Sequence, residues 1–175
     1  LDAKVQMGPV INEKALNKIH MMVTEASATN TLLCGGKINK KPTDNIPFAF
    51  GQYTTVYGWF YMPTVITDVD VHDMIAQEEV FGPVLSIIPF DTEEEAIAIG
   101  NDVVFGLAAG VWTSNIGRAL RMSEKLRAGT VWVNTYRAVS FTSPFGGYKR
   151  SGEGRENGQE AIKAFLQVKS VWIAQ

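Results

Sequence analysis

Apolar residues near the start of the chain recur every three or four positions, with polar residues between them. The recurring apolar residues are Leu16, Ile19, Val23 and Ala26. Asn12 precedes them, and asparagine is favoured at the position that caps a helix. The pattern therefore predicts an amphipathic helix over residues 13–28. A short apolar run at 31–36, which ends in paired glycines, predicts a strand after that helix.

Short apolar runs alternate with helical patterns in the middle of the chain. The runs span residues 84–90, 107–113 and 130–134. The first helical pattern opens with Thr92 and Glu95, which match a capping box. Strands that alternate with amphipathic helices favour parallel pairing with helices on the faces of the sheet. We therefore expect an α/β fold with a parallel βαβαβ sheet covered by helices.

The second helical pattern follows Ser114, a predicted cap, and stops before Gly129. The residues predicted to face inward on this helix are Ile116, Leu120, Ser123 and Leu126.

The other segments are less regular. Residues 37–53 are polar and contain prolines, which predicts a surface excursion, and 57–66 predicts edge or interrupted strands around Pro63. A helical stripe at 161–166 precedes residues 168–173, whose alternation predicts a final strand.

Composition and charge narrow the classes of function. The chain has 175 residues, 46% of them hydrophobic, and a formal net charge of -2, as expected for a soluble globular protein with one core. This balance gives no electrostatic reason to expect a nucleic-acid partner. No apolar stretch approaches the ~20 residues of a membrane helix, and no secretory signal opens the chain. We therefore expect a cytoplasmic protein without a membrane partner.

The few thiol and imidazole groups argue against a metal site. His20 and His72 are far apart in the sequence and no cysteine cluster accompanies either, so no bound metal is expected. Cys34 is a candidate nucleophile because thiolates attack carbonyls. It ends an apolar strand beside no group that would lower its pKa, which favours a structural role.

A glycine-rich segment at 152–158 suggests a phosphate loop, but its spacing is one residue longer than the dinucleotide motif and no strand directly precedes it.

Glu78 and Glu79 are more informative. Adjacent carboxylates are usually solvated, yet these two precede Val80, Phe81 and a Gly-Pro turn that leads into an apolar run. A carboxylate there is able to accept hydrogen bonds from a vicinal diol, and an adjacent aromatic ring offers a stacking face.

Several motifs together resemble the NAD(P)-dependent aldehyde dehydrogenase superfamily. They are Glu-Glu-Val-Phe-Gly-Pro at 78–83, Phe-Gly-Leu-Ala-Ala at 105–109, Gly-Thr-Val-Trp-Val-Asn at 129–134, Pro-Phe-Gly-Gly-Tyr-Lys at 144–149, Ser-Gly at 151–152 and Gly-Arg-Glu at 154–156. Gln-Met-Gly-Pro at 6–9 also resembles a family segment. The motifs keep the family's order and spacing, and the resemblance covers essentially the whole chain.

The resemblance implies the fold of the family's catalytic domain and contacts to NAD or NADP. Glu79 matches the glutamate that holds the nicotinamide-ribose hydroxyls, and Phe81 matches the aromatic beside that ribose and ring. Leu107 matches a leucine near the nicotinamide, and Lys18 resembles a residue that touches the ribose.

On the substrate side, the resemblance places residues 135–145 in the wall of the aldehyde tunnel. Phe145 matches an aromatic wall position, and Val139 stands where some relatives have a bulky aromatic. Residues 1–158 are expected to form the C-terminal part of the catalytic domain. Residues 159–175 are expected to form a C-terminal helix and an oligomerisation strand, which makes a homo-oligomer through Val168 to Ile173 the expected assembly.

The resemblance also implies an activity, the oxidation of an aldehyde to a carboxylic acid. The chain resembles only the C-terminal third of the family's members and opens with Leu1. The family's cysteine nucleophile is therefore expected outside it, and the chain alone is expected to be inactive. The alternatives are a noncatalytic truncated interaction module with the same fold, and a piece of a longer enzyme.

Overall fold

A computed structural model describes residues 6–39, 43–47, 53–56 and 58–175 of the chain. The chain forms two compact units, residues 1–89 and 90–175, each of which is described by itself. The boundary expected at residue 158 concerns the family's domains, and it stays a prediction.

Unit 1 contains the predicted first helix. Helix α1 spans Glu13–Ala26, and the Oδ1 of Asn12 accepts a hydrogen bond of 2.9 Å from the backbone N–H of Ala15. The predicted inward stripe is confirmed, because Leu16, Ile19, Val23 and Ala26 are all buried. The helix ends two residues before the expected position, where the N–H of Ser27 still reaches the Val23 carbonyl at 2.9 Å.

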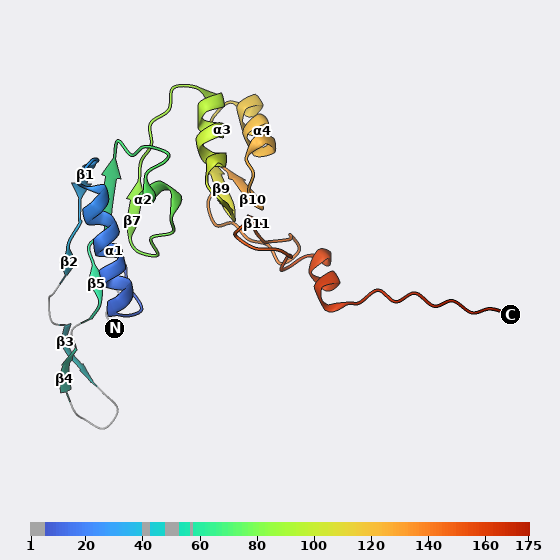
Figure 1. The fold of residues 1–175 in the computed structure, drawn as a ribbon, viewed down its shortest axis with the longest axis horizontal. Coiled ribbons are helices and arrows are strands. Elements are labelled where there is room, and N and C mark those ends of the chain that lie inside the picture. Colours follow the sequence, from blue (N-terminus) through green and yellow to red (C-terminus); the bar gives the residue numbers. More distant parts are fainter. Residues whose placement is uncertain (1–5, 40–42, 48–52, 57) are drawn as a thin grey trace. The chain divides into compact units, whose positions relative to one another are not determined.

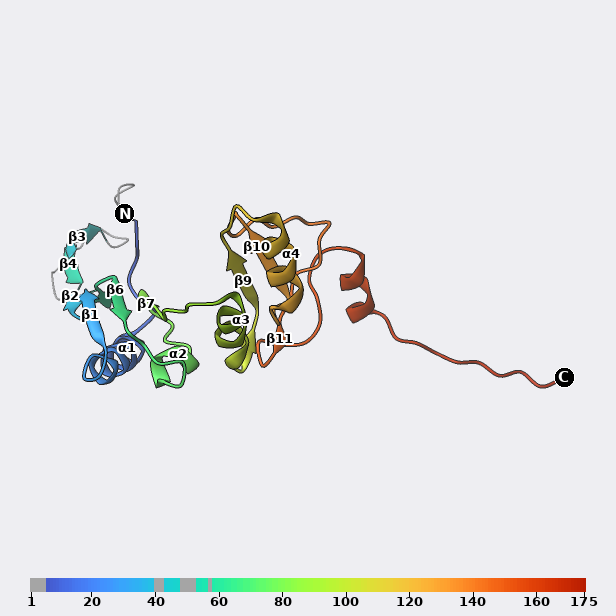
Figure 2. The same ribbon diagram turned by 90° about the horizontal axis from the view of Figure 1, so that it is seen from above.

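A three-stranded sheet packs against α1, and Figures 1 and 2 show them side by side. Its strands, in spatial order, are β1 (Thr31–Cys34), β6 (Thr64–Thr67) and β7 (Val84–Ser86). Strand β6 runs antiparallel to β1 and parallel to β7. It is thus a central strand, so the edge alternative expected for residues 57–66 does not hold. The other alternative, interrupted strands, is confirmed, because Pro63 lies between the strand at Phe60–Tyr61 and β6.

The segment at 37–53, expected to be a surface excursion, contains strands that the sequence did not predict. It includes β2 (Ile38–Asn39), which pairs with β5 (Phe60–Tyr61), and β3 (Thr43–Pro47), which pairs with β4 (Tyr53–Val56). Strand pairing uses backbone groups, so polar sequence does not prevent it. Residues 40–42 and 48–52 lie outside the described residues. Helix α2 (Met74–Gln77) completes the elements described in unit 1.

Unit 2 alternates helices and strands. Helix α3 (Glu93–Asp102) leads through β8 (Phe105–Gly106) to β9 (Ala108–Val111), and helix α4 (Ile116–Lys125) then leads to β10 (Thr130–Val133). Strands β9 and β10 pair in parallel, and β8 pairs antiparallel with β11 (Tyr148–Lys149). Helices α3 and α4 lie side by side (Figures 1 and 2).

The α/β class and the parallel pairing are confirmed, and the pairing is described within each unit. Strand β7 pairs with β6 in unit 1, whereas β9 and β10 pair with each other in unit 2. Sequence order predicted which strands are parallel and could not predict which strands are neighbours.

Helix α4 spans Ile116–Lys125 and differs from expectation at both ends. Its cap is Asn115, whose Oδ1 accepts from the Arg118 N–H at 3.0 Å, and not Ser114. Gly129 lies beyond the helix end and is needed for another reason, because a Cβ there would collide with the backbone of Gly146.

The inward face of α4 is also different. Ala119 and Met122 are its buried residues, while Ile116 and Leu120 are exposed. The buried face of α4 is thus the one that carries Ala119 and Met122, and the apolar spacing alone did not identify it.

The end of the chain carries less regular structure than expected. A 3₁₀ helix, Gln159–Phe165, replaces the predicted α-helical stripe. Within the described residues, 166–175 form neither helix nor strand, so the strand predicted at 168–173 has no partner in the chain.

Candidate functional site

Three of the predicted cofactor residues lie together in unit 1. Lys18 is on α1, and Glu79 and Phe81 are in the segment between α2 and β7. The Nζ of Lys18 donates a hydrogen bond of 3.1 Å to the backbone carbonyl oxygen of Glu79. Residues that are 61 positions apart in sequence are therefore joined directly.

Backbone hydrogen bonds hold both ends of this segment. The N–H of Glu78 reaches the Met74 carbonyl at 2.8 Å, which ties the segment to α2. At the other end, the N–H of Thr64 donates to the Pro83 carbonyl at 2.8 Å, which ties it to β6. The segment is therefore fixed between two elements that belong to the core of unit 1.

Gly82 allows this segment to lie close against α1. A Cβ at Gly82 would be 2.6 Å from the Cδ1 of Ile19, which is fully buried. Val80 packs against the core cluster, so it anchors the segment from the inside. A side chain larger than hydrogen at position 82 would separate the segment from the helix.

The two side chains proposed to meet the cofactor point away from the core. Phe81 has a positive φ of 56° and is 79% exposed, although it is a large aromatic. Glu79 is also exposed. A positive φ is unusual for a bulky residue and indicates that the surrounding contacts impose it. An accessible carboxylate two residues from an accessible aromatic ring fits a ribose diol that adjoins a planar ring.

The other predicted residues lie together in unit 2. Leu107, Val139 and Phe145 line one hollow of about 420 Å³. Leu107 comes from the junction of β8 and β9, while the other two come from the segment that follows β10. The structure thus brings together the leucine expected near the nicotinamide and both expected substrate-wall residues. Their roles stay predictions.

Hydrogen bonds at the ends of β9 and β10 fix the start of the substrate-wall segment. Asn134 has a φ of 53°, a left-handed conformation that asparagine tolerates. Its side chain donates to the Thr113 carbonyl and accepts from the Thr113 N–H, both at 2.9 Å. Further along, the indole N–H of Trp132 donates to the Ala138 carbonyl at 2.8 Å.

The far end of the segment is fixed by a backbone bridge. The N–H of Phe145 donates to the Glu156 carbonyl at 2.8 Å, and the N–H of Glu156 donates back at 2.7 Å. The glycine-rich segment therefore holds the substrate wall in place.

The sequence analysis did not predict Trp132 as a lining residue of this hollow, and it included Tyr136 and Arg137 only within the range 135–145, without a role of their own. The rings of Trp132 and Tyr136 meet edge to face with centroids 5.5 Å apart, and the Arg137 guanidinium lies 5.2 Å from the Tyr136 centroid. A usable signal was present, because a tryptophan, a tyrosine and an arginine fall within six positions at the end of a predicted strand.

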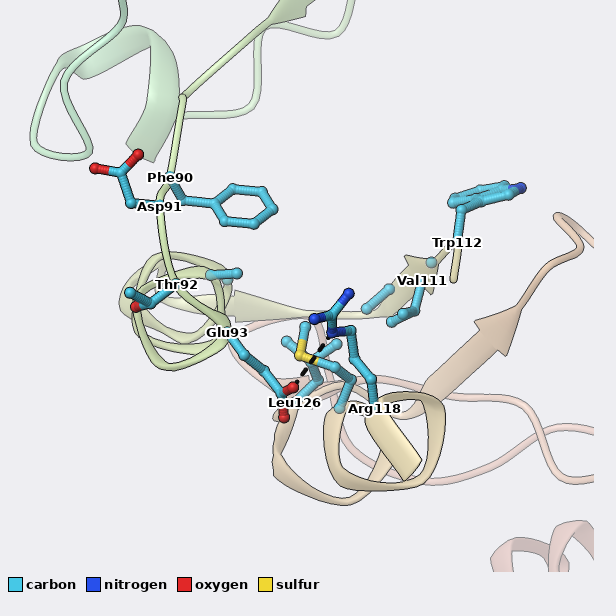
Figure 3. A pocket seen from close by; sticks show the side chains of 13 residues that line it. Phe90, Asp91, Thr92, Glu93, Val111, Trp112, Arg118 and Leu126 are labelled. Carbon is cyan, nitrogen blue, oxygen red and sulfur yellow. Dashed lines mark hydrogen bonds and ion pairs between the residues drawn. The ribbon is translucent and has the colours of Figure 1, made fainter. Parts of the chain in front are cut away.

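A separate hollow of about 470 Å³ lies between α3, α4 and β9 (Figure 3). Glu93, one of its lining residues, accepts from Arg118 at 3.4 Å and from Arg121 at 2.7 Å. Hydrogen bonds from Arg121, aided by Arg118, lower the pKa of Glu93 to about 2. None of the residues predicted to bind cofactor or substrate lines this hollow, and we assign it no role in binding.

The described residues offer neither a cluster of metal ligands nor a membrane-spanning helix. No group of three His, Cys, Asp or Glu side chains there is arranged to hold a metal ion. Among the same residues, no helix combines the length and apolar character needed to cross a bilayer.

Comparison with known proteins identifies the family. Residues 1–171 match the model of the aldehyde dehydrogenase family. The chain is 43% identical over 174 residues to the betaine aldehyde dehydrogenase of Cereibacter sphaeroides, covering 99% of this chain and 33% of that protein. It is also 43% identical over 173 residues to an aldehyde dehydrogenase of Enchytraeus buchholzi, covering 98% and 32% respectively.

Solved structures give the same result. The aldehyde dehydrogenase of Mycobacterium tuberculosis, complexed with NAD+, matches with a TM-score of 0.84 and 44% identity, over 99% of this chain and 33% of that one. A betaine aldehyde dehydrogenase of Staphylococcus aureus in complex with NAD+ matches with a TM-score of 0.82 and 42% identity, over 95% and 31%. The chain spans about a third of the length of these relatives. It belongs to the aldehyde dehydrogenase family.

Proposed function

We propose that the full-length protein that contains this chain oxidises an aldehyde to a carboxylic acid, with NAD as the hydride acceptor. Water supplies the second oxygen of the acid, and the cofactor takes the hydride from the aldehyde carbon. The observation that carries this proposal is the Lys18–Glu79 hydrogen bond, which fixes the segment that exposes Glu79 and Phe81.

The residues of unit 1 bind the cofactor in this proposal. The Glu79 carboxylate accepts hydrogen bonds from the two ribose hydroxyls beside the nicotinamide. Phe81 lies against the ribose and ring, and its exposure leaves the aromatic face available. Lys18 acts through Glu79 as a positioning residue, because its Nζ is already engaged by the Glu79 carbonyl.

The residues of unit 2 shape the substrate site. Leu107 contacts the nicotinamide, and Val139 and Phe145 form the apolar wall against which the aldehyde lies. Their shared hollow supports this assignment. An apolar wall excludes water from the face of the aldehyde that receives no nucleophile.

Cys34 is not the nucleophile in this proposal. It is exposed at the end of β1, and its Sγ lies 3.9 Å from the Pro63 carbonyl oxygen. The nucleophile is therefore proposed to come from another part of the full-length polypeptide, and the 175-residue chain alone is proposed to be inactive.

The test is NADH formation by the full-length polypeptide with a panel of aldehydes. We expect turnover with NAD that survives Cys34→Ala. Loss of turnover in that variant would assign the nucleophile to Cys34 instead. No turnover with any aldehyde would favour the alternative function, a noncatalytic interaction module.

A homo-oligomer is proposed as the assembly. Val168, Trp172 and Ile173 are almost fully exposed, and residues 168–173 have no strand partner in the described chain. An unpaired apolar segment of this kind is able to add to a sheet edge of another subunit.

A further inference from the structure

The hollow lined by Leu107, Val139 and Phe145 has an aromatic side that resembles a site for a cation. Trp132 and Tyr136 both line it, and their rings meet edge to face with centroids 5.5 Å apart. The faces of tyrosine and tryptophan rings attract quaternary ammonium groups. Betaine aldehyde, the compound in the names of several relatives, carries such a group.

A cation of the chain itself already lies over that aromatic side. The Arg137 guanidinium carbon is 5.2 Å from the centroid of the Tyr136 ring, within the range of a cation–π interaction. The indole hydrogen bond from Trp132 to the Ala138 carbonyl, at 2.8 Å, holds the backbone next to Arg137. The position of this arginine is therefore set by the same loop that forms the substrate wall.

No opposite charge compensates the guanidinium inside the hollow. Of the described residues that line it, Arg137 alone is charged. Two positive charges in a hollow of about 420 Å³ would be close enough to repel each other strongly. A trimethylammonium group would meet both an occupied aromatic face and an unfavourable charge.

We propose that Arg137 is a specificity-determining residue that makes this enzyme discriminate against aldehydes with a quaternary ammonium group. The substrate class is aldehydes without a positive charge. This inference rests on the proposed function, since it assigns the substrate class of the same site. The arginine occupies the aromatic face that a cationic substrate would contact, and its positive charge repels such a substrate.

The test compares two substrates of nearly equal shape in the full-length enzyme. Betaine aldehyde carries the trimethylammonium group, and tert-butylacetaldehyde is its uncharged analogue with carbon in place of nitrogen. For the parent enzyme we expect a kcat/KM at least about tenfold higher for the uncharged compound, as expected for repulsion between partly solvated charges. Arg137→Gln should reduce this ratio about tenfold, whereas Arg137→Lys should keep it within about twofold.

Two controls separate charge from shape. Arg150→Gln removes an exposed arginine that does not line the hollow, and the substrate ratio should not change. Added salt should narrow the ratio in the parent enzyme and leave it unchanged in Arg137→Gln, because screening acts only where the charge is present.

The outcomes distinguish the two proposals. If the enzyme oxidises neither compound nor any other aldehyde with NAD, the proposed function fails. If it oxidises tert-butylacetaldehyde but Arg137→Gln leaves the ratio unchanged, the proposed function stands and the role of Arg137 is overturned. A parent enzyme that prefers betaine aldehyde would overturn it as well.

Discussion

The Nζ of Lys18 donates a hydrogen bond of 3.1 Å to the backbone carbonyl oxygen of Glu79, and so joins α1 to the segment between α2 and β7. The lysine therefore stabilises the position of the glutamate and not its charge, because the acceptor is a backbone atom. We therefore propose different roles for these two residues, which the family resemblance placed at the same ribose.

The first prediction concerns Glu79. In the full-length enzyme, Glu79→Gln replaces charge-assisted hydrogen bonds to ribose with neutral ones, so we expect the KM for NAD to rise about tenfold. Steady-state kinetics with varied NAD measures this effect. Glu78→Gln is the matched control, since Glu78 is the adjacent exposed carboxylate and is proposed to contact no cofactor. Equal behaviour of the two variants would return Glu79 to the role of a solvated surface residue.

The second prediction separates positioning from direct binding. Lys18→Met keeps most of the apolar length of the side chain and removes the donor to the Glu79 carbonyl, so we expect a rise of about threefold to tenfold in the KM for NAD. Lys14→Met, on the same helix and also exposed, is the control. In Glu79→Gln, the further loss of Lys18 should have a smaller effect than in the parent, because the lysine acts through the glutamate. If the two substitutions had fully additive effects on the KM for NAD, the proposal that Lys18 acts through Glu79 would be contradicted.

The sequence predicted elements better than it predicted partners. Asn12 and Thr92 cap helices as expected, because capping depends on residues only a few positions away. Which strands are neighbours depends on contacts far along the chain. Pro63 correctly indicated an interruption between strands, but the sequence did not show that β6 is a central strand. The face of α4 was misjudged because spacing alone did not show that Ala119 and Met122 are buried.

In the candidate site, too, local features could be predicted from the sequence and long-range contacts could not. The resemblance pointed to Glu79, Phe81 and Phe145 because each lies inside a specific motif. Arg137 and its contact with Tyr136 were not predicted, since a cation–π pair depends on the conformation of one loop and leaves no periodic signal. The left-handed conformation of Phe81 was likewise invisible in the sequence, because aromatic residues rarely adopt it.

The third prediction tests a close approach of two backbone segments in unit 2. A Cβ at Gly129 would overlap the carbonyl oxygen of Gly146, and backbone atoms cannot move aside as a flexible side chain does. We expect Gly129→Ala to destabilise the protein by about 1–3 kcal/mol or more, as for other overpacked sites. Thermal unfolding of the full-length enzyme measures the change. Gly8→Ala is the control, because a Cβ at Gly8 meets no atom within 4 Å. If both variants lowered the unfolding temperature equally, the overlap with Gly146 would not be the cause of the destabilisation.

The fourth prediction concerns acid stability. Hydrogen bonds from Arg121 lower the pKa of Glu93 from 4.5 to about 2 in the folded chain. A carboxyl group with a lowered folded pKa stabilises the fold above its unfolded pKa, and that contribution is lost as the pH falls from about 4.5 toward 2. We therefore expect Glu93→Gln to lower the unfolding temperature at neutral pH, and the difference from the parent to shrink as the pH approaches about 2.

Glu124→Gln is the control for this measurement, since Glu124 is an exposed carboxylate on α4 outside the ion pairs of Glu93. If the difference in unfolding temperature between Glu93→Gln and the parent stayed constant from neutral to acidic pH, the loss of stability would come from packing and not from the charge.

The last prediction concerns residues 168–175 and the proposed homo-oligomer. Val168 and Trp172 are almost fully exposed, and residues 168–173 combine β-branched and aromatic side chains without a strand partner in the described chain. If another subunit pairs with this segment, deleting 168–175 removes both the backbone ladder and the apolar contacts. We expect the full-length enzyme to sediment as an oligomer and the deletion variant to sediment as a smaller species or to aggregate. Replacing Lys169 with Gln tests charge alone and should leave the oligomer intact, because the segment associates through its backbone and apolar groups. A deletion variant that keeps the parent's sedimentation coefficient would place the subunit contact elsewhere.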